Sequence, residues 1–450
     1  MTSQEAGLDP GRDALGALAV EYGLIDAQAL ERCRALAAAT TPPSPLGQLL
    51  VSQGLLREGV VRRLEAAARR VPGEAAPGDP LEALVAERAP RLAGAKLGAW
   101  LLLMRDADAS ELVLAAGAVP RLRVRGRLVA VGDTPLAPAA AAELAAWASG
   151  TATAQEARGA ERIHEEPGVG RFRVQTMRHT GGQVLALRRL ADAPPDPEAL
   201  GVGPVADEVV GLSKGLVLVT GPRRSGKTST LAAIVGAIAR RRQRHVVTLE
   251  RPIEHLHTSA EALISQREIP RHAPSFEVAL KAILREDANV IVLGELDEPE
   301  RIAVALSAAE TGHVVLGTMR TPDAQRTVVR ILDGMPARRR PQVRAMLAAM
   351  LRLVVSQQLV PSLDGRRLHL AAEVLRATPA VANVIREDRL HQLRQVIETG
   401  GPEGMRLMDD ALADLVRAGH VSIAEAAARA TDPGAFLSHL EARAERTGRR

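Results

Sequence analysis

The sequence predicts an α/β protein whose largest domain is a parallel sheet covered by helices. Four near-continuous apolar runs, at 216–219, 246–249, 290–293 and 314–316, alternate with segments of helical periodicity. Such runs are typical of strands that are buried on both faces of a parallel sheet. The first run leads directly into a glycine-rich loop and a helical segment, an arrangement suited to phosphate binding. These observations predict a phosphate-binding α/β domain over residues 201–370.

Residues 89–190 have a different rhythm and predict a smaller α+β domain with an antiparallel sheet. A helical stretch at 92–104 precedes short segments in which apolar and polar residues alternate, at 111–115, 121–124 and 171–175. Turn residues separate these segments, as expected for strands joined by hairpins or short loops.

Residues 1–72 contain an internal repeat with an offset of 31 residues. The Leu-Gly pair at 15–16 recurs at 46–47, and the Gly-Leu-Ile of 23–25 recurs as Gly-Leu-Leu at 54–56. In each copy an amphipathic helical segment follows, so we expect a small helical module of two similar halves. The two helices are expected at 27–39 and 58–69.

Two stretches rich in proline and glycine divide the chain further. We expect linkers at 73–88, which follows the helical module, and at 191–200, which carries the sequence ADAPPDPEAL. The remaining segment, 371–450, has helical periodicity and is expected to be a helical C-terminal region.

The composition is that of a globular protein of a reducing compartment. The 450 residues contain no run of about 18 uncharged apolar residues, and the N-terminus lacks the pattern of a signal peptide. A single cysteine, Cys33, excludes an internal disulfide and a cysteine-rich zinc site. We therefore expect a cytoplasmic protein with no membrane span.

The net charge of +5 permits contact with nucleic acid, but the composition argues against it. All but four of the 58 basic residues are arginine, which indicates a bias of usage along the whole chain. Aromatic residues make up only 1% of the chain, so few side chains could stack on bases. No nucleic-acid partner is expected.

The segment Gly221–Thr228 matches the phosphate-loop pattern G-x-x-x-x-G-K-[ST] between a strand and a helix. Backbone amides of the loop are expected to face the phosphates of ATP, with Lys227 at the β/γ oxygens and the Thr228 hydroxyl on Mg²⁺. The expected nucleotide-binding residues here are Gly221, Pro222, Arg223, Arg224, Ser225, Gly226, Lys227, Thr228 and Ser229.

Carboxylates follow two of the predicted core strands. Glu295 comes just after the run 290–293, where a phosphate-loop protein needs a carboxylate on the metal side. Glu250 and Glu254 lie at the end of the strand over 246–249. His313 stands at the start of another strand, and by itself such a histidine is more often structural than functional.

A series of segments in one order resembles the secretion and type IV pilus ATPases, and most closely their retraction branch, the PilT type. The resemblance covers about three quarters of the chain, from Ala109 onward. The segments are ASEL (109–112), GRFRV (170–174), GPRRSGKTST (221–230), TLERPIEHLH (248–257), SQREI (265–269), LREDANVIVLGE (284–295), AAETGHVVLGT (308–318), VIRE (384–387) and GMRLMDDALADLV (404–416).

This resemblance implies a RecA-like motor domain preceded by a PAS-like α+β domain. It also implies a homohexamer with ATP and Mg²⁺ between domains of neighbouring subunits, which powers pilus disassembly and twitching motility. The implied partners are an inner-membrane pilus platform protein and a paralogous motor subunit. Such a protein would lie at the inner face of the cell membrane, associated with it only through these partners.

The resemblance also assigns roles to single residues. Glu295 would be the metal- or water-side glutamate, and Thr228 and Glu295 together would be the metal ligands. Glu254 would be the base that polarises water, with Glu250 as the alternative, and His313 would sense the γ-phosphate. Three arginines match positions from which the family draws contacts to nucleotide. They are Arg171, Arg173 and Arg188.

Three further features bear on the relation to the superfamily. Assembly and secretion ATPases of this superfamily usually carry a four-cysteine zinc insertion, which a chain with one cysteine cannot form. The segment 378–387 resembles a signature of the retraction branch, with Ala382 in place of its arginine.

The N-terminal repeat resembles cyclic-di-GMP-binding modules, but Ala14 and Pro45 stand where those have arginine.

The chain departs from the family pattern around the expected site. Arg320 replaces a histidine, Arg251 replaces an aspartate, and Asp297 replaces an arginine. We expect Arg251 and Asp297 to form a charge-swapped pair. We also expect slow turnover, because Arg320 cannot exchange protons near neutral pH, and because Arg251 should lower the pKa of both neighbouring glutamates. Arg223 and Arg224 add bulk and charge to the variable part of the loop.

Three functions fit these observations. The first is an ATP-hydrolysing motor for pilus retraction, and the second is a weakly hydrolysing regulatory subunit of a pilus or secretion machine. A DNA-translocating motor is the third, which the match of the flanking segments and the scarcity of aromatic residues disfavour.

Overall fold

A computed structural model of the chain divides into two compact units, and each is described by itself. The larger unit consists of residues 78–359 and 372–408, and the smaller consists of residues 1–77, 360–371 and 409–450. The structure describes residues 27–39, 46–53, 61, 96–124, 127–151, 159–364, 367–434, 436–437 and 440.

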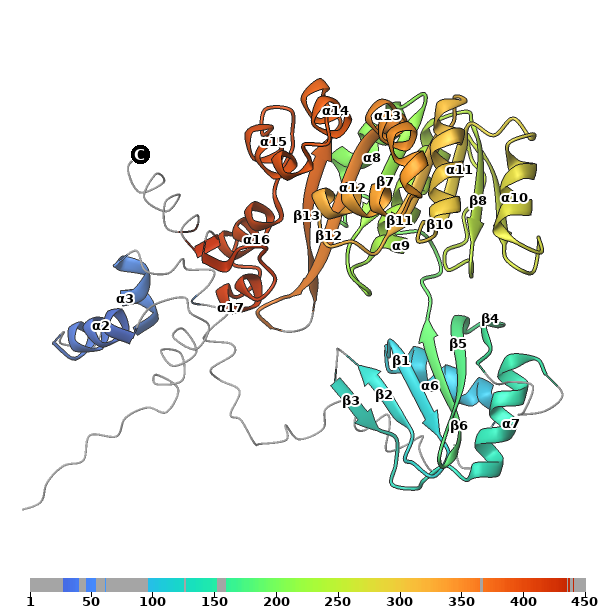
Figure 1. Cartoon of the computed structure of the whole chain (residues 1–450). Coiled ribbons are helices and arrows are strands. Elements are labelled where there is room, and N and C mark those ends of the chain that lie inside the picture. Colours follow the sequence, from blue (N-terminus) through green and yellow to red (C-terminus); the bar gives the residue numbers. More distant parts are fainter. Residues whose placement is uncertain are drawn as a thin grey trace, which may run out of the picture. The chain divides into compact units, whose positions relative to one another are not determined.

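The larger unit begins with a six-stranded antiparallel sheet in the order β3-β2-β1-β6-β5-β4 (Figure 1). Alternate residues of β1 are buried, as the sequence pattern predicts, and they pack with the buried face of α6. α7 packs on β5 and β6. The bounds are α6 Leu97–Asp106, β1 Glu111–Ala115, β2 Arg121–Val124, β3 Arg127–Ala130, α7 Pro138–Ser149, β4 Glu161–Glu166, β5 Gly170–His179 and β6 Gly182–Arg189.

A seven-stranded sheet follows, in the order β13-β12-β7-β11-β10-β8-β9 (Figure 1). The pairs from β12 through β9 are parallel. β7 and β11 are buried along their whole length. The strand bounds are β7 Gly215–Thr220, β8 His245–Glu250, β9 Leu263–Glu268, β10 Val290–Glu295, β11 Val314–Met319, β12 Leu351–Pro361 and β13 Leu368–Arg376.

Helices cover both faces of this sheet. Leu216 and Leu218 of β7 join the core that α10 to α15 form, while the alternate residues Val217 and Val219 point to the other face. α8 and α9 pack together, and α9 also packs on β7. The bounds are α8 Gly203–Gly211, α9 Lys227–Arg241, α10 Phe276–Ile283, α11 Pro299–Glu310, α12 Ala324–Asp333, α13 Arg340–Met350, α14 Pro379–Arg386 and α15 Leu393–Thr399.

This architecture confirms the predicted α/β fold class with an antiparallel domain before it, and residues 191–200 contain neither helix nor strand. The exact domain limits stay predictions. One expectation was wrong: the region 371–450 is not wholly helical, because β13 extends to Arg376. β12 was also missed, since the polar pair Ser356 and Gln357 interrupts its apolar run, although both side chains are buried.

The smaller unit contains helices in its described parts. α2 (Ala27–Ala39) matches its predicted range and packs against α3 (Leu46–Ser52), with Leu30, Cys33 and Leu50 buried. The repeat elements at 15–16, 23–25 and 54–56, the linker 73–88 and all but one residue of the helix expected at 58–69 lie outside the described residues. α16 (Met408–Arg417) starts at the boundary between the units, and α17 (Ile423–Ala427) follows.

Within the described part of the chain, no helix has the length and apolar character needed to cross a membrane.

A buried carboxylate of β13 accepts hydrogen bonds from two backbone amides of the larger unit. Glu373 is only 2% exposed and accepts hydrogen bonds from the amides of Ala324 at 2.8 Å and Met408 at 3.4 Å. Those residues begin α12 and α16, where backbone amides need acceptors. α12 follows Arg320 closely in the chain, so this cap also fixes the segment that leaves β11.

We predict that Glu373 makes the free energy of unfolding fall as pH rises. Burial raises its pKa from 4.5 to about 7, so between these values the folded state keeps a proton that the unfolded state has lost. The free energy of unfolding of the Glu373→Gln variant does not contain this contribution. Its excess over the wild-type value should therefore increase between about pH 4.5 and about pH 7. Urea unfolding across this range measures it, and a difference independent of pH would contradict the assignment.

Candidate nucleotide site

The phosphate loop is held in shape by a close approach of β12. Gly221 has a φ of 142°, and a Cβ at this position would lie 2.3 Å from the carbonyl oxygen of Gln357. The buried Gln357 side chain donates from Nε2 to the Ser225 carbonyl oxygen at 2.7 Å. Only glycine fits the first contact, and the second fixes the far side of the loop. Arg224 also has a positive φ, 64°, a conformation that non-glycine residues adopt at some cost.

Lys227 begins α9 and folds back over the loop. Its Nζ donates to the carbonyl oxygens of Gly221 at 2.8 Å and Pro222 at 2.7 Å. Burial lowers the pKa of this half-buried ammonium, while the Glu295 charge opposes that shift. The ammonium therefore lies inside the curve of the loop, as the predicted contact to phosphate requires.

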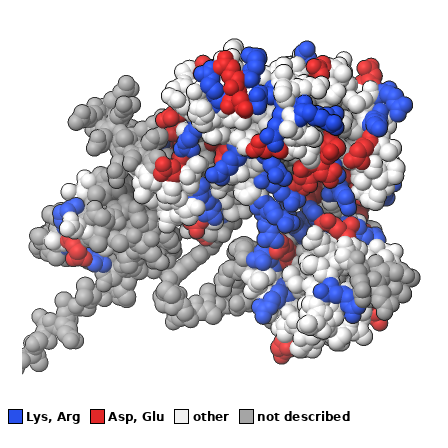
Figure 2. Space-filling model, in the orientation of Figure 1, with Lys and Arg blue, Asp and Glu red and all other residues white. Residues whose placement is uncertain are grey.

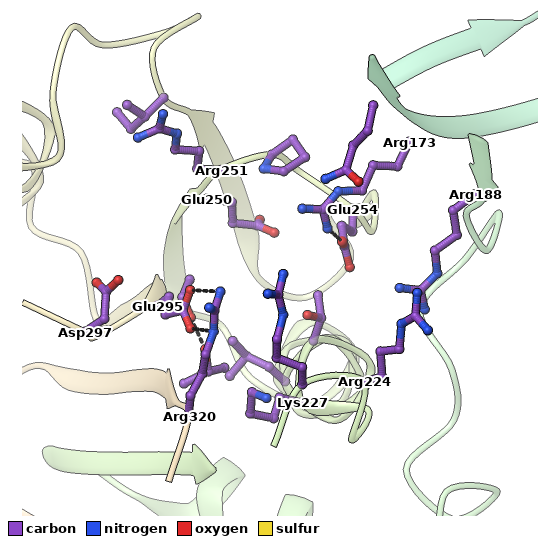
Figure 3. Close-up of a pocket in the computed structure, with 18 of the residues that line it drawn as sticks. Arg173, Arg188, Arg224, Lys227, Glu250, Arg251, Glu254, Glu295, Asp297 and Arg320 are labelled. Carbon is purple, nitrogen blue, oxygen red and sulfur yellow. Dashed lines mark hydrogen bonds and ion pairs between the residues drawn. The ribbon is translucent and has the colours of Figure 1, made fainter. Parts of the chain in front are cut away.

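A pocket of about 980 Å³ opens beside the loop and is lined by both domains of the larger unit. Residues 223–229 form one wall, β5 and β6 contribute a second, and the ends of β8 and β10 a third. Basic side chains are concentrated here, with carboxylates among them (Figures 2 and 3). The basic lining residues are Arg173, Arg188, Arg223, Arg224, Lys227, Arg251, Arg301 and Arg320.

Parallel register brings the ends of the central strands to one edge of the pocket. β10 ends at Glu295, which pairs in register with Thr318 of β11, and Arg320 follows β11 directly. The Arg320 guanidinium contacts both carboxylate oxygens of Glu295, with Nη2 to Oε2 at 2.7 Å and Nε to Oε1 (Figure 3). This bidentate geometry is a strong form of ion pair, and it neutralises the predicted metal-side glutamate.

Glu250 ends β8 on the same edge and has an unusual electrostatic setting. Its Oε1 accepts hydrogen bonds from Thr248 Oγ1 at 2.8 Å and Gln266 Nε2 at 3.2 Å. Burial nevertheless raises its pKa from 4.5 to about 7. The expectation that Arg251 lowers this pKa is therefore wrong: desolvation is the largest cause, and Arg251 is not one of the groups that shift it.

The arginines of β5 hold the loop that follows β8. Arg171 donates to the carbonyl oxygens of Ile253 at 2.8 Å and Glu254 at 3.0 Å. Arg173 forms an ion pair with the Glu254 carboxylate (Figure 3). Arg173 and Arg188 line the pocket, so they are placed to contact a nucleotide, whereas the Arg171 guanidinium is occupied by this loop.

His313 does not lie at this site. It precedes β11, and its carbonyl oxygen accepts a hydrogen bond from the amide of Gly215 at the start of β7, whereas the phosphate loop follows the end of β7. Its Nδ1 lies 2.6 Å from the Ala288 carbonyl oxygen. The strands separate His313 from the loop by their full length, so its expected role as γ-phosphate sensor is wrong within one subunit.

The expected charge-swapped pair is also wrong. Asp297 pairs with Arg301 one helical turn later at 3.2 Å. Arg251 and Asp297 are both exposed, they lie apart in Figure 3, and no ion pair joins them within the described residues. The sequence prediction also omitted Gln357 and Gln266. A glutamine pair inside the apolar stretch 351–360 was the available signal for Gln357.

Comparison with known proteins agrees with this geometry. The family model for "Type II/IV secretion system protein" matches residues 154–410. PilT of Pseudomonas aeruginosa, a type IV pilus retraction ATPase, is 38% identical over 334 residues, which is 73% of this chain and 96% of PilT. The chain belongs to the type II/IV secretion system protein family and is of the PilT type.

Two further comparisons support the assignment. The type IV pilus ATPase PilU of Pseudomonas aeruginosa is 34% identical over 73% of this chain and 87% of its own length. A crystal structure of the pilus retraction motor PilT with bound ADP aligns with a TM-score of 0.67 at 32% identity, covering 76% of this chain and 98% of that one. The RecA-like fold predicted for this PilT-type chain is thereby confirmed.

We predict that Lys227→Ala abolishes binding of a fluorescent ATP analogue and leaves the melting temperature within about 2 °C of wild type, because a change outside the apolar core that opens no cavity alters stability little. Among the described residues the ammonium donates to two loop carbonyls, so its loss removes the phosphate contact and no core packing. The matched control is Lys214→Ala, which removes an exposed lysine outside the pocket. Near-wild-type affinity in the Lys227 variant would contradict the phosphate-loop assignment.

Proposed function

We propose that this chain is an ATP-hydrolysing motor of the pilus-retraction class that acts as a homohexamer. The observation that carries the proposal is a phosphate loop facing Glu250 and Glu295 across one cationic pocket in a PilT-type chain. Loop amides, Lys227 and the pocket arginines supply the positive partners that a triphosphate requires. The relative solved with ADP supports nucleotide binding in this pocket.

The pocket also fits a magnesium ion bound with the nucleotide. Thr228 and Glu295 both line it and offer oxygen ligands, the kind that Mg²⁺ prefers. No group of three or more acidic, histidine or cysteine residues that could hold a metal exists among the described residues, which suits Mg²⁺ because it takes few protein ligands. When bound, the ion would neutralise negative charge on the phosphates.

Glu250 is the better base for activating water. A general base works best when its pKa is close to the working pH, and the pKa of Glu250 is about 7. Glu254 is instead engaged by Arg173, which ties its carboxylate to β5. We therefore assign the base to Glu250, the alternative at the sequence level, and give Glu254 the role of joining the loop to the α+β domain.

Arg320 favours the second candidate function, a weakly hydrolysing regulatory subunit. Its ion pair with Glu295 must open before that carboxylate can serve a metal ion. The guanidinium, which stays charged at all working pH values, would then contact the γ-phosphate. Each cycle would have to break and restore this bidentate pair, so we expect nucleotide binding to be tight and turnover slow.

The assembly and partners follow from the same class. The names of the relatives, a retraction ATPase and the pilus ATPase PilU, support work at a type IV pilus. In this proposal the hexamer acts in the cytoplasm at the inner face of the membrane, on an inner-membrane platform protein. A paralogous motor of the same type would be a second partner.

We predict that purified protein releases phosphate from Mg·ATP slowly and that Arg320→His accelerates release several-fold. The histidine would no longer hold Glu295 in a bidentate pair, so the carboxylate would be available at lower cost. The control is Arg338→His, which changes an exposed arginine outside the pocket in the same way. Brisk release by wild type with no effect of Arg320→His would show the substitution to be neutral. No release by either protein would favour the regulatory subunit.

A further inference from the structure

A second, much smaller cavity lies behind the phosphate loop. It has a volume of about 20 Å³, enough for one water molecule. Thr228, Thr248, Glu250, His255 and His257 give it a polar side. The apolar remainder comes from α9 and β10, through Leu231, Ala232, Val235 and Val292.

His255 lines this cavity and carries an unpartnered polar atom. The residue is 8% exposed, and its buried Nδ1 has no hydrogen-bond partner among the described residues. A buried nitrogen of this kind is costly unless a water molecule or another group pairs with it. Burial lowers the pKa of His255, with Arg171 and Arg188 adding to the shift and Glu254 opposing it, so the ring is neutral near pH 7.

Glu250 and His255 are held near each other by one side chain. Gln266 Nε2 donates both to Glu250 Oε1 at 3.2 Å and to the His255 carbonyl oxygen at 2.9 Å. Gln266 Oε1 accepts from the amide of His257 at 2.8 Å. Thr248 Oγ1 also donates to Glu250 Oε1. The two donors Gln266 and Thr248 therefore use the same oxygen, and Glu250 Oε2 can accept from a further partner.

We propose that this cavity holds one water molecule that joins His255 Nδ1 to Glu250, and that His255 is thereby a positioning residue for Glu250. The water satisfies the histidine nitrogen and donates to the carboxylate. A donor to the charged form keeps Glu250 ionised and turned toward its place at the strand end. The inference rests on the proposed function only in taking Glu250 as the base.

The other charged groups around Glu250 do not supply this donor. Glu254 and Glu268 are acidic and raise its pKa further. His257 lines the same cavity, but burial lowers its pKa to about 4, so it carries no charge at neutral pH. A water molecule in the cavity would therefore lie among Glu250, His255 and the Thr228 hydroxyl, and it is the group that can donate to Glu250 from this side.

The kinetic test compares His255→Phe with His255→Asn in the full-length protein. Phenylalanine removes the nitrogen and fills the cavity, whereas the asparagine amide keeps a polar atom near the Nδ1 position. In the phenylalanine variant we expect the midpoint of the acidic limb of the kcat–pH profile to shift to a pH about one unit higher. At pH 6 this shift lowers kcat about tenfold. The KM for ATP and kcat at pH 9 should stay within about twofold, and asparagine should restore most of the profile.

A spectroscopic test does not depend on turnover. Infrared spectra are recorded without nucleotide for wild type, for His255→Phe, and for each of these with Glu250→Gln added. Subtracting the spectrum with Glu250→Gln from the one without it isolates the band of the protonated Glu250 carboxyl. In His255→Phe this band should persist to about one pH unit higher than in wild type. If wild type hydrolyses no ATP but the band shifts, the inference stands and the proposed function fails. A band and a kinetic limb that are both unchanged in His255→Phe would overturn the inference.

Discussion

Parallel pairing of β7, β11, β10 and β8 is the constraint on which the site depends. It sends the carboxyl ends of all four strands to one edge, so Thr220, Met319, Glu295 and Glu250 end side by side although they are far apart in sequence. The same pairing places the residues that precede these strands at the opposite edge of the sheet. His313 directly precedes β11, so it lies away from the pocket. β12 extends the sheet beside β7, and its Gln357 then fixes the phosphate loop at two points.

Within that frame the site is organised by arginine–carboxylate pairing. Arg320 forms an ion pair with Glu295, and Arg173 forms one with Glu254. Arg224 pairs with Glu111 at 3.2 Å. Glu250 is the exception, because uncharged donors and burial surround it and its pKa rises to about 7. The site thus separates one carboxylate suited to taking a proton from others that arginines engage in ion pairs. A nucleotide must compete directly with Glu295 for the Arg320 guanidinium.

Local patterns allowed much of this to be predicted. The apolar runs located the central strands, and the spacing of Gly221, Gly226 and Lys227 located the loop, because both signals depend on neighbours in sequence. Partners across the sheet could not be read in this way, so the Arg320–Glu295 pair was missed and a pair between Arg251 and Asp297 was expected instead. The error at His313 was avoidable, since a residue that opens a parallel strand lies at the edge opposite the loop.

The central claim is that Arg320 exchanges Glu295 for the terminal phosphate of the nucleotide. A structure of the protein with a non-hydrolysable ATP analogue and Mg²⁺ tests it most directly. Our account predicts that the Arg320 guanidinium lies within hydrogen-bond distance of the γ-phosphate, about 3 Å, and that its bidentate contact with Glu295 is broken. An Arg320–Glu295 pair that persists unchanged beside a fully bound nucleotide would contradict the account.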